Sequence, residues 1–292
     1  MSRKRIENSA WREMIEEETR NVETFDGTVC VNVSGGHGSA VTWYRCIEFY
    51  GRDRVQPVFA DTNSEHPDLY RFLDDCEKQF DQKLTRLNDG RNIWDVFDKT
   101  GMMRIARAGN ACKASIELKQ KPLARFYKES GADAIALGLG FLEAERMAAF
   151  RRKMEPVRVL FPLAVRPRFS ECETHEEIKR IGLRPCTVYA DGQPHNNCRK
   201  FGCILAGVNQ WAADVTANAD GFDYSAKREG VFFDKTGFAI CRNQTRGTVN
   251  PYPLAQLRED VNAGKTFRDD WKSQCVCMEP QPALFSADAC FG

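Results

Sequence analysis

The stretch Thr28-Val-Cys-Val-Asn-Val-Ser-Gly-Gly-His-Gly-Ser39 decides the fold, because an apolar run passes directly into a glycine-rich turn. The run predicts a strand over 28–34, and the residues beyond it predict a helix near 39–50. Paired glycines allow a tight turn, and the N–H groups and dipole of a helix start favour an anion. This order of strand, turn and helix predicts a phosphate-binding site; a helix start without a ligand is the alternative.

The spacing of the glycines separates this turn from two common phosphate-binding motifs. The chain has neither a G-x-G-x-x-G dinucleotide fingerprint here nor a G-x-x-x-x-G-K-[ST] loop with its lysine. The pattern that is present is Ser34-Gly-Gly-x-x-Ser39. Nucleotide binding is the leading hypothesis from this turn.

Short apolar strands continue to alternate with helices along the chain. The expected strands are 28–34, 55–60, 83–87, 133–139 and 157–163. The expected helices lie near 39–50, 67–80, 113–130 and 142–153. Such alternation packs as a parallel sheet with helices on both faces, and ligands bind at the carboxyl ends of its strands. The sequence therefore predicts an α/β fold with a doubly wound, mostly parallel, five-stranded sheet.

Two regions flank this α/β unit, which is expected to span 25–190. Residues 1–24 predict a charged helical arm whose sparse apolar stripe consists of Trp11, Ile15 and Val22. Residues 191–292 form a cysteine-bearing C-terminal appendage that is rich in Gly, Asn and Asp. Within the appendage, the runs 230–234 and 237–241 predict a β-hairpin that turns through Lys235-Thr236.

Composition limits the classes of partner. The chain has 292 residues and a formal charge of +1, so its overall charge does not argue for nucleic-acid binding. No apolar run is long enough to cross a bilayer, and the first residues lack the apolar core of a signal peptide. We therefore expect a soluble cytoplasmic protein without a membrane partner. Twelve cysteines without a secretion signal are unlikely to be a disulfide framework, so some should bind metal or carry sulfur.

Several motifs resemble one family. The second strand ends in Asp61-Thr-Asn-Ser-Glu65-His-Pro67, which is similar to the D-T-G-x-E-x-P segment of phosphoadenosine phosphosulfate reductase-like proteins. These proteins belong to the PP-loop ATP-pyrophosphatase superfamily, also described as adenine nucleotide alpha hydrolase-like. Cys112 and Leu118-Lys119-Gln-Lys-Pro122 resemble its C-x-x-x-L-K-x-x-P segment, although the cysteine lies about one turn further away. Gly138 to Arg146 is similar to its G-x-R-x-x-E-S-x-x-R stretch.

The later part of the chain resembles a phage and bacterial branch of this family. His195-Asn-Asn-Cys198-x-x-x-x-Cys203 is similar to the H-N-N-C signature of that branch, and Cys275-Val-Cys277 is similar to its terminal C-x-C. The likeness runs from about residue 28 to residue 280. One departure lies in the first loop, where His37 and Gly38 replace the lysine and aspartate of classical members.

The resemblance implies an ATP or related adenine nucleotide with Mg²⁺. The residues implied in nucleotide binding are Ser34, Gly35, Gly36, His37, Gly38, Ser39, Asp61 and Arg146. The candidates for catalysis are His37, Asp61 and Cys112. An imidazole in place of lysine is mostly neutral near pH 7, so the loop lacks the permanent positive charge that classical members place beside the pyrophosphate.

The cysteines of the C-terminal region are the candidate metal ligands, and they are Cys198, Cys203, Cys275 and Cys277. Four thiolates suit a [4Fe-4S] cluster or otherwise Zn²⁺, because soft sulfur ligands select both. The alternative is that Cys198 and Cys203 are turn and core residues and that the terminal pair has no metal. Cys112 is a further ligand implied by the resemblance.

These parts suggest an ATP-dependent sulfurtransferase or reductase-like enzyme. In related sulfurtransferases an acceptor oxygen attacks the α-phosphorus, pyrophosphate leaves, and a sulfur nucleophile replaces the adenylate. The acceptor is open, and a nucleic acid or a sulfur donor protein could be the partner; the oligomeric state is open as well. Two alternatives are a catalytically lapsed nucleotide-binding protein with structural zinc, and a thioredoxin-dependent sulfonucleotide reductase that uses Cys290.

Overall fold

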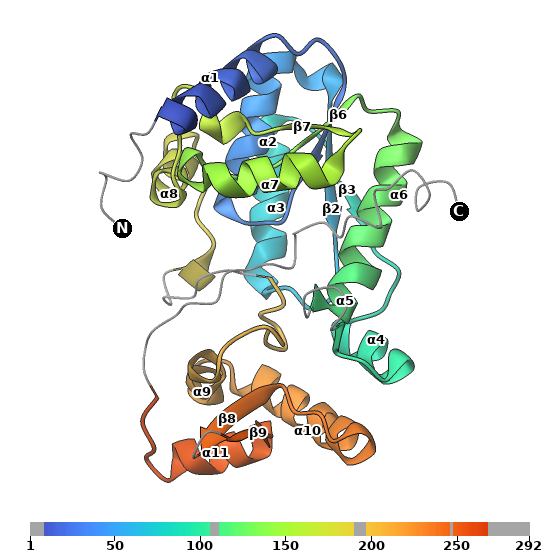
Figure 1. Cartoon of the computed structure of the whole chain (residues 1–292), viewed down its shortest axis with the longest axis vertical. Coiled ribbons are helices and arrows are strands. Elements are labelled where there is room, and N and C mark those ends of the chain that lie inside the picture. The colour runs from blue at the N-terminus through green and yellow to red at the C-terminus, as the bar shows by residue number, and fades with distance from the viewer. Residues whose placement is uncertain (1–8, 106–110, 190–196, 246–247, 268–292) are drawn as a thin grey trace.

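A five-stranded parallel sheet forms the centre of the protein (Figure 1). The computed structural model describes residues 9–105, 111–189, 197–245 and 248–267. The order of the strands in the sheet is β3-β2-β1-β6-β7, and every neighbouring pair is parallel. Their bounds are β1 Val29–Asn32, β2 Val55–Ala60, β3 Thr85–Leu87, β6 Ala134–Ala136 and β7 Arg158–Leu160. The predicted α/β fold and its five parallel strands are confirmed.

Helices cover both faces of this sheet because its strands alternate between two buried sides. On β1, Val29 and Val31 pack with α2 (His37–Tyr50) and α3 (Pro67–Phe80). Cys30 faces the opposite side and packs with α6, whose bounds are Lys121–Ser130. Beside α6, α7 (Ala144–Met154) covers β6 and β7, and α8 (Glu171–Arg180) packs against α2. The doubly wound arrangement is confirmed.

The N-terminal helix α1 (Ser9–Glu23) lies along β7 and α7. Its apolar residues Ile15 and Val22 are buried, as the stripe of the predicted arm requires. Glu18 is also fully buried, and its carboxylate accepts a hydrogen bond of 2.8 Å from the Phe161 N–H and pairs with Arg151. Burial raises the pKa of the Glu18 carboxyl, while the nearby guanidinium opposes that rise.

A second core, made mostly by the elements after the cysteine-bearing turn at 197–203, lies below the sheet in Figure 1. It contains the helices α9 (Val208–Ala217), α10 (Ala219–Thr236) and α11 (Leu254–Asn262) and the hairpin of β8 (Cys241–Thr245) and β9 (Thr248–Tyr252). Apolar residues of α4 (Ile93–Thr100) and of the segment up to Leu118 pack in the same core. The predicted division at residue 190 stays a prediction; residues from both sides of it, such as Trp94, Leu118 and Trp211, pack in this core.

The hairpin predicted over 230–241 is wrong. Residues up to Thr236 belong to α10, and Gly237 ends that helix in the left-handed conformation. The buried residues Phe222, Ser225, Glu229 and Phe232 recur at helical spacing, so one face of α10 is inside the core. The true hairpin begins only at Cys241.

Shorter elements connect these parts. The predicted helix over 113–130 is a continuous helical segment made of α5 (Lys113–Ser115), a π-helical turn η4 (Ile116–Gln120) and α6. A small antiparallel pair, β4 (Arg104–Ile105) and β5 (Ala111–Cys112), precedes it. The short 3₁₀ turns are η2 Arg52–Arg54, η5 Phe141–Glu143, η6 Pro162–Ala164 and η7 Thr187–Tyr189. Among the residues described, no helix combines the length and apolar character needed to span a membrane.

Candidate active site

The phosphate loop, residues 34–39, joins β1 to the start of α2 and is closed by its own hydroxyl groups. Ser39 Oγ accepts hydrogen bonds from the Ser34 N–H at 3.0 Å and from Ser34 Oγ at 3.2 Å. It donates its own proton to the carbonyl oxygen of Gly36 at 2.8 Å. Both serines of the predicted motif therefore set the shape of the turn.

Two glycines of the loop stand where a side chain would collide. Gly35 has φ +82°, and a Cβ there would lie 2.6 Å from Leu69 Cδ1. A Cβ at Gly36 would lie 3.2 Å from the Tyr189 hydroxyl oxygen and 3.5 Å from Ser34 Oγ. Because neither residue has a side chain, the backbone N–H groups of the turn can be approached closely by a phosphate.

The His37 side chain is buried beneath the loop, where it is 6% exposed. Its Nε2 accepts the Cys186 N–H at 3.3 Å, and its Nδ1 lies 3.2 Å from Nδ1 of His175. Burial, with smaller contributions from His175 and Lys179, lowers the pKa of His37 to about 4. The imidazole is thus neutral at pH 7 and does not supply the positive charge of a lysine.

Asp61 follows β2 at the same edge of the sheet as the phosphate loop. Its Oδ1 accepts hydrogen bonds of 2.8 Å from the Asn63 N–H and from the Tyr70 hydroxyl. Its Oδ2 accepts one of 3.0 Å from Asn88 Nδ2, in the segment after β3. Burial and the Asp61 carboxylate raise the pKa of Tyr70, so the phenol stays protonated and donates.

The segment after β6 lies against the other side of the loop. A Cβ at Gly138 would lie 2.9 Å from the backbone of Gly38, so these two chains are in close contact. Arg146, in the first turn of α7, donates from Nη1 to Glu143 at 2.7 Å and is partly exposed. Ser34–Ser39, Asp61 and Arg146 therefore follow β1, β2 and β6 along one edge of the sheet, although the Arg146 charge is paired with a carboxylate.

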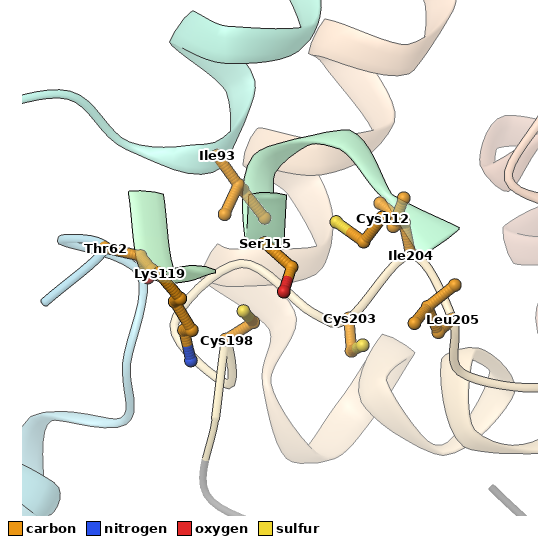
Figure 2. Close-up of a pocket in the computed structure, with 9 residues that line it drawn as sticks. All are labelled: Thr62, Ile93, Cys112, Ser115, Lys119, Cys198, Cys203, Ile204 and Leu205. Carbon is orange, nitrogen blue, oxygen red and sulfur yellow. The ribbon is translucent and has the colours of Figure 1, made fainter. Parts of the chain in front are cut away.

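Three cysteines line a small cavity beside this edge (Figure 2). Cys112, Cys198 and Cys203 surround it with Thr62, Ile93, Ser115, Lys119, Ile204 and Leu205. The cavity volume is about 20 Å³, which is enough for one water molecule and far too small for a nucleotide. The candidate catalytic Cys112 is therefore placed with the candidate ligands Cys198 and Cys203, and not on the phosphate loop.

A buried ion pair joins the cavity to the segment that follows β2. Glu65 is fully buried and Lys119 is 3% exposed, and Lys119 Nζ lies 3.0 Å from Glu65 Oε1. Glu65 also accepts hydrogen bonds from Thr62 Oγ1 at 2.9 Å and from the Cys198 N–H at 2.6 Å. Lys119 donates a further hydrogen bond to Asn197 Oδ1 at 3.1 Å. The pair thus connects three segments that are far apart in the sequence.

The turn over 197–203, called here the cysteine turn, is held by contacts along its whole length. Cys198 has φ +57°, which is uncommon for a residue with a side chain and costs about 1–3 kcal/mol. The Lys200 N–H donates to the Ser64 carbonyl at 3.0 Å, and the buried Arg199 pairs with Asp214 of α9. Ser225 of α10 donates to the carbonyl of residue 201 at 2.5 Å.

The described residues contain no group of three or more His, Cys, Asp or Glu side chains arranged to hold a metal ion. Two of the four predicted ligands, Cys275 and Cys277, lie outside the residues that the structure describes, as do His195 and Cys290. The predicted four-cysteine site therefore stays a prediction. Burial raises the pKa of the thiols of Cys30, Cys46, Cys76 and Cys241, which suits inert core residues.

Residues 28–204 match the phosphoadenosine phosphosulfate reductase domain, which is more than half of the chain. The chain belongs to this family. Among solved structures it is similar to phosphoadenylyl-sulfate (PAPS) reductase from Candida auris in its phosphate complex, with 16% identity and a TM-score of 0.46. That match covers 68% of this chain and 95% of the other. No curated protein matches the chain.

Within the phosphoadenosine phosphosulfate reductase domain, three residues were not singled out by the sequence reasoning. His175 and Tyr189 contact His37; His175 belongs to no motif, and Tyr189 only begins the stretch that contains the H-N-N-C signature. Lys119 was quoted only as part of a motif, and its pairing with Glu65 could have been suspected because a buried lysine requires a carboxylate. The assignment to the phage and bacterial branch stays a prediction.

Replacing Lys119 by methionine should destabilise the protein by about 3 kcal/mol, because it leaves the fully buried Glu65 without its cation. Lys121→Met is the matched control, since Lys121 lies two residues further along and is 51% exposed. It should cost at most about 0.5 kcal/mol. Urea unfolding of both variants measures the difference, and a difference under about 1 kcal/mol would contradict the prediction.

The buried His37 should make the protein less stable in acid. Because its pKa is about 4 in the folded protein and about 6.5 for an unperturbed histidine, the unfolded chain binds a proton between these values that the folded one does not. Stability should therefore fall by about 2–3 kcal/mol from this group between pH 7.5 and 4.5. Urea unfolding at both pH values should show a smaller fall for His37→Gln, and an equal fall in both proteins would refute the assignment.

Proposed function

We propose that this protein is an adenine-nucleotide-dependent enzyme of the sulfonucleotide reductase or sulfurtransferase kind. The phosphate loop and Asp61 hold the nucleotide, and the cysteines beside them carry the sulfur chemistry. In the finer proposal the nucleotide is ATP: an acceptor oxygen attacks the α-phosphorus, pyrophosphate leaves, and a thiolate sulfur displaces the adenylate as AMP.

The observation that carries the proposal is the position of the cysteine cavity relative to the nucleotide edge. Thr62 lines the cavity and directly follows Asp61, whose carboxylate stands at the end of β2. Glu65, three residues further on, accepts the N–H of Cys198. The segment after β2 therefore carries both the carboxylate of Asp61, proposed to face the nucleotide, and Glu65, which holds the cysteine turn. A reaction that passes sulfur to a nucleotide-activated group needs these two parts close together.

The described residues differ in how well they suit a nucleotide, Mg²⁺ and a cysteine-bound metal. The loop suits a phosphate group, since Gly36 has no side chain and the hydroxyl oxygens of Tyr189 and Ser34 lie close to it. Mg²⁺ would neutralise phosphate charge and help pyrophosphate to leave. For an iron–sulfur cluster or Zn²⁺, the thiols of Cys112, Cys198 and Cys203 have suitable chemistry, but a site would need further ligands such as Cys275 and Cys277, so no step is assigned to it.

Adenine-nucleotide binding tests the core of the proposal. Calorimetry of the full chain with ATP and Mg²⁺ should show binding, and Asp61→Asn should weaken it about tenfold, since an amide cannot accept from both Tyr70 and Asn88 without losing one bond. Asp53→Asn is the matched control, because Asp53 is exposed at the opposite end of β2. Absence of binding of ATP, AMP and a 3′-phosphorylated sulfonucleotide by the wild type would overturn the proposal.

A second candidate is a nucleotide-binding protein that has lost catalysis and uses zinc structurally. The observation that favours it is the neutral, buried His37, which leaves the described part of the loop without the lysine charge of classical members. Persistent absence of pyrophosphate release, despite nucleotide binding, would support this candidate.

Metal content separates the two candidates further. Protein purified without oxygen should contain iron and acid-labile sulfide if the cysteines serve the sulfur chemistry of the first candidate, and Cys198→Ser should lose both. Cys30→Ala, in the core of β1, is the control and should keep them. Zinc without sulfide would favour the structural role, and protein without any metal would refute the predicted four-cysteine site.

A further inference from the structure

Tyr189 ends the short helix η7 and lies over the phosphate loop. Its hydroxyl oxygen and Ser34 Oγ lie 3.2 Å and 3.5 Å from the point that a Cβ at Gly36 would occupy. Two hydroxyl groups from different parts of the chain therefore converge on one space above the loop. A Cβ at residue 36 would press against the tyrosine oxygen, so glycine lets the Tyr189 hydroxyl lie close to the backbone of the loop.

His37 sets the position of the tyrosine ring. The ring centroids of His37 and Tyr189 are 4.3 Å apart, with an interplanar angle of 42°. The Cys186 N–H donates to His37 Nε2, and the Tyr189 N–H donates to the Cys186 carbonyl at 3.4 Å. Because Nε2 accepts, the proton of the neutral imidazole is on Nδ1, facing His175.

The segment that carries Tyr189 is also fixed from outside the loop. The Thr187 N–H donates to Asp68 Oδ2 at 2.8 Å, and Asp68 is held in turn by Arg71. Arg71 Nη2 also donates to the Pro185 carbonyl at 3.1 Å. The segment 185–189 is thus tied to α3 on one side and to His37 on the other, so the hydroxyl of Tyr189 is preorganised over Gly36.

We propose that Tyr189 contacts a phosphate group of the bound nucleotide and that His37 is the positioning residue that sets it there. The phenol donates to an anionic phosphate oxygen above Gly36, and such a charge-assisted bond is roughly twice as strong as a neutral one. The neutral His37 then has a role of its own. It positions the Tyr189 hydroxyl, which donates to the phosphate where classical members use a lysine charge. The inference rests on the proposed nucleotide function and names a residue of that same site.

The test compares ATP with adenosine, because only ATP can use the tyrosine hydroxyl. Calorimetry of the full chain with Tyr189→Phe should show a 10- to 100-fold loss of ATP affinity, as expected for a hydrogen bond to a charged group, and unchanged adenosine affinity. Tyr127→Phe, on α6 and the opposite face of the sheet, is the control and should bind both ligands as the wild type does. Thermal unfolding checks that each variant is folded.

The positioning role of His37 has its own readout. His37→Leu removes the acceptor for the Cys186 N–H and should lose ATP affinity as Tyr189→Phe does. His37→Gln places an oxygen near the position of Nε2 and should recover part of that loss. Combining His37→Leu with Tyr189→Phe should cost no more than Tyr189→Phe alone, because both act on one contact.

The outcomes separate this inference from the function on which it rests. If the wild type binds neither ATP nor another adenine nucleotide, both are overturned. If the wild type binds ATP and Tyr189→Phe binds it within twofold, or loses adenosine affinity equally, the proposed function stands and the role of Tyr189 is refuted. If the double variant loses much more than Tyr189→Phe, the positioning role of His37 is refuted.

Discussion

The buried carboxylate of Glu65 is the interaction on which the candidate site depends. A charge removed from water must be paired and hydrogen-bonded, and Glu65 satisfies this with Lys119, Thr62 and the Cys198 N–H. These partners come from the segment after β2, from the π-helical turn and from the cysteine turn. Loss of Lys119 would leave an unpaired charge in the interior, and loss of the Cys198 N–H would leave a carboxylate oxygen without its hydrogen bond, so the three segments keep one arrangement.

The cysteine turn depends on this arrangement for its unusual backbone. Cys198 holds a positive φ, and its N–H is used by Glu65. On the other side, Arg199 pairs with the buried Asp214, so the turn is anchored to the second core as well. The turn therefore joins the parallel sheet to the C-terminal helices, and the small cavity with its three cysteines lies at that junction.

The edge of the sheet that we propose to bind the nucleotide is built mostly from neutral donors. Serine hydroxyls close the phosphate loop, the first turn of α2 presents backbone N–H groups, and His37 is uncharged beneath them. Arg146 is the cation that the sequence pointed to, and its charge is paired with Glu143. Anion binding at such an edge relies on direction and preorganisation of hydrogen bonds more than on net charge.

The sequence by itself determined the five strands, the helices α2 and α3 and the phosphate turn, because apolar periodicity and glycine conformation act within a few residues. The sequence predicted a hairpin at α10, because Lys235-Thr236-Gly237 resembles a turn. This prediction was wrong, since Phe222 and Phe232 are buried on one face of a helix that continues to Thr236. Only the tertiary structure decided that His37 is neutral, that Glu65 meets Lys119 and that Tyr189 lies over Gly36. The physical reason is that burial, ion pairing and pKa depend on contacts between residues far apart in the sequence, which no local pattern records.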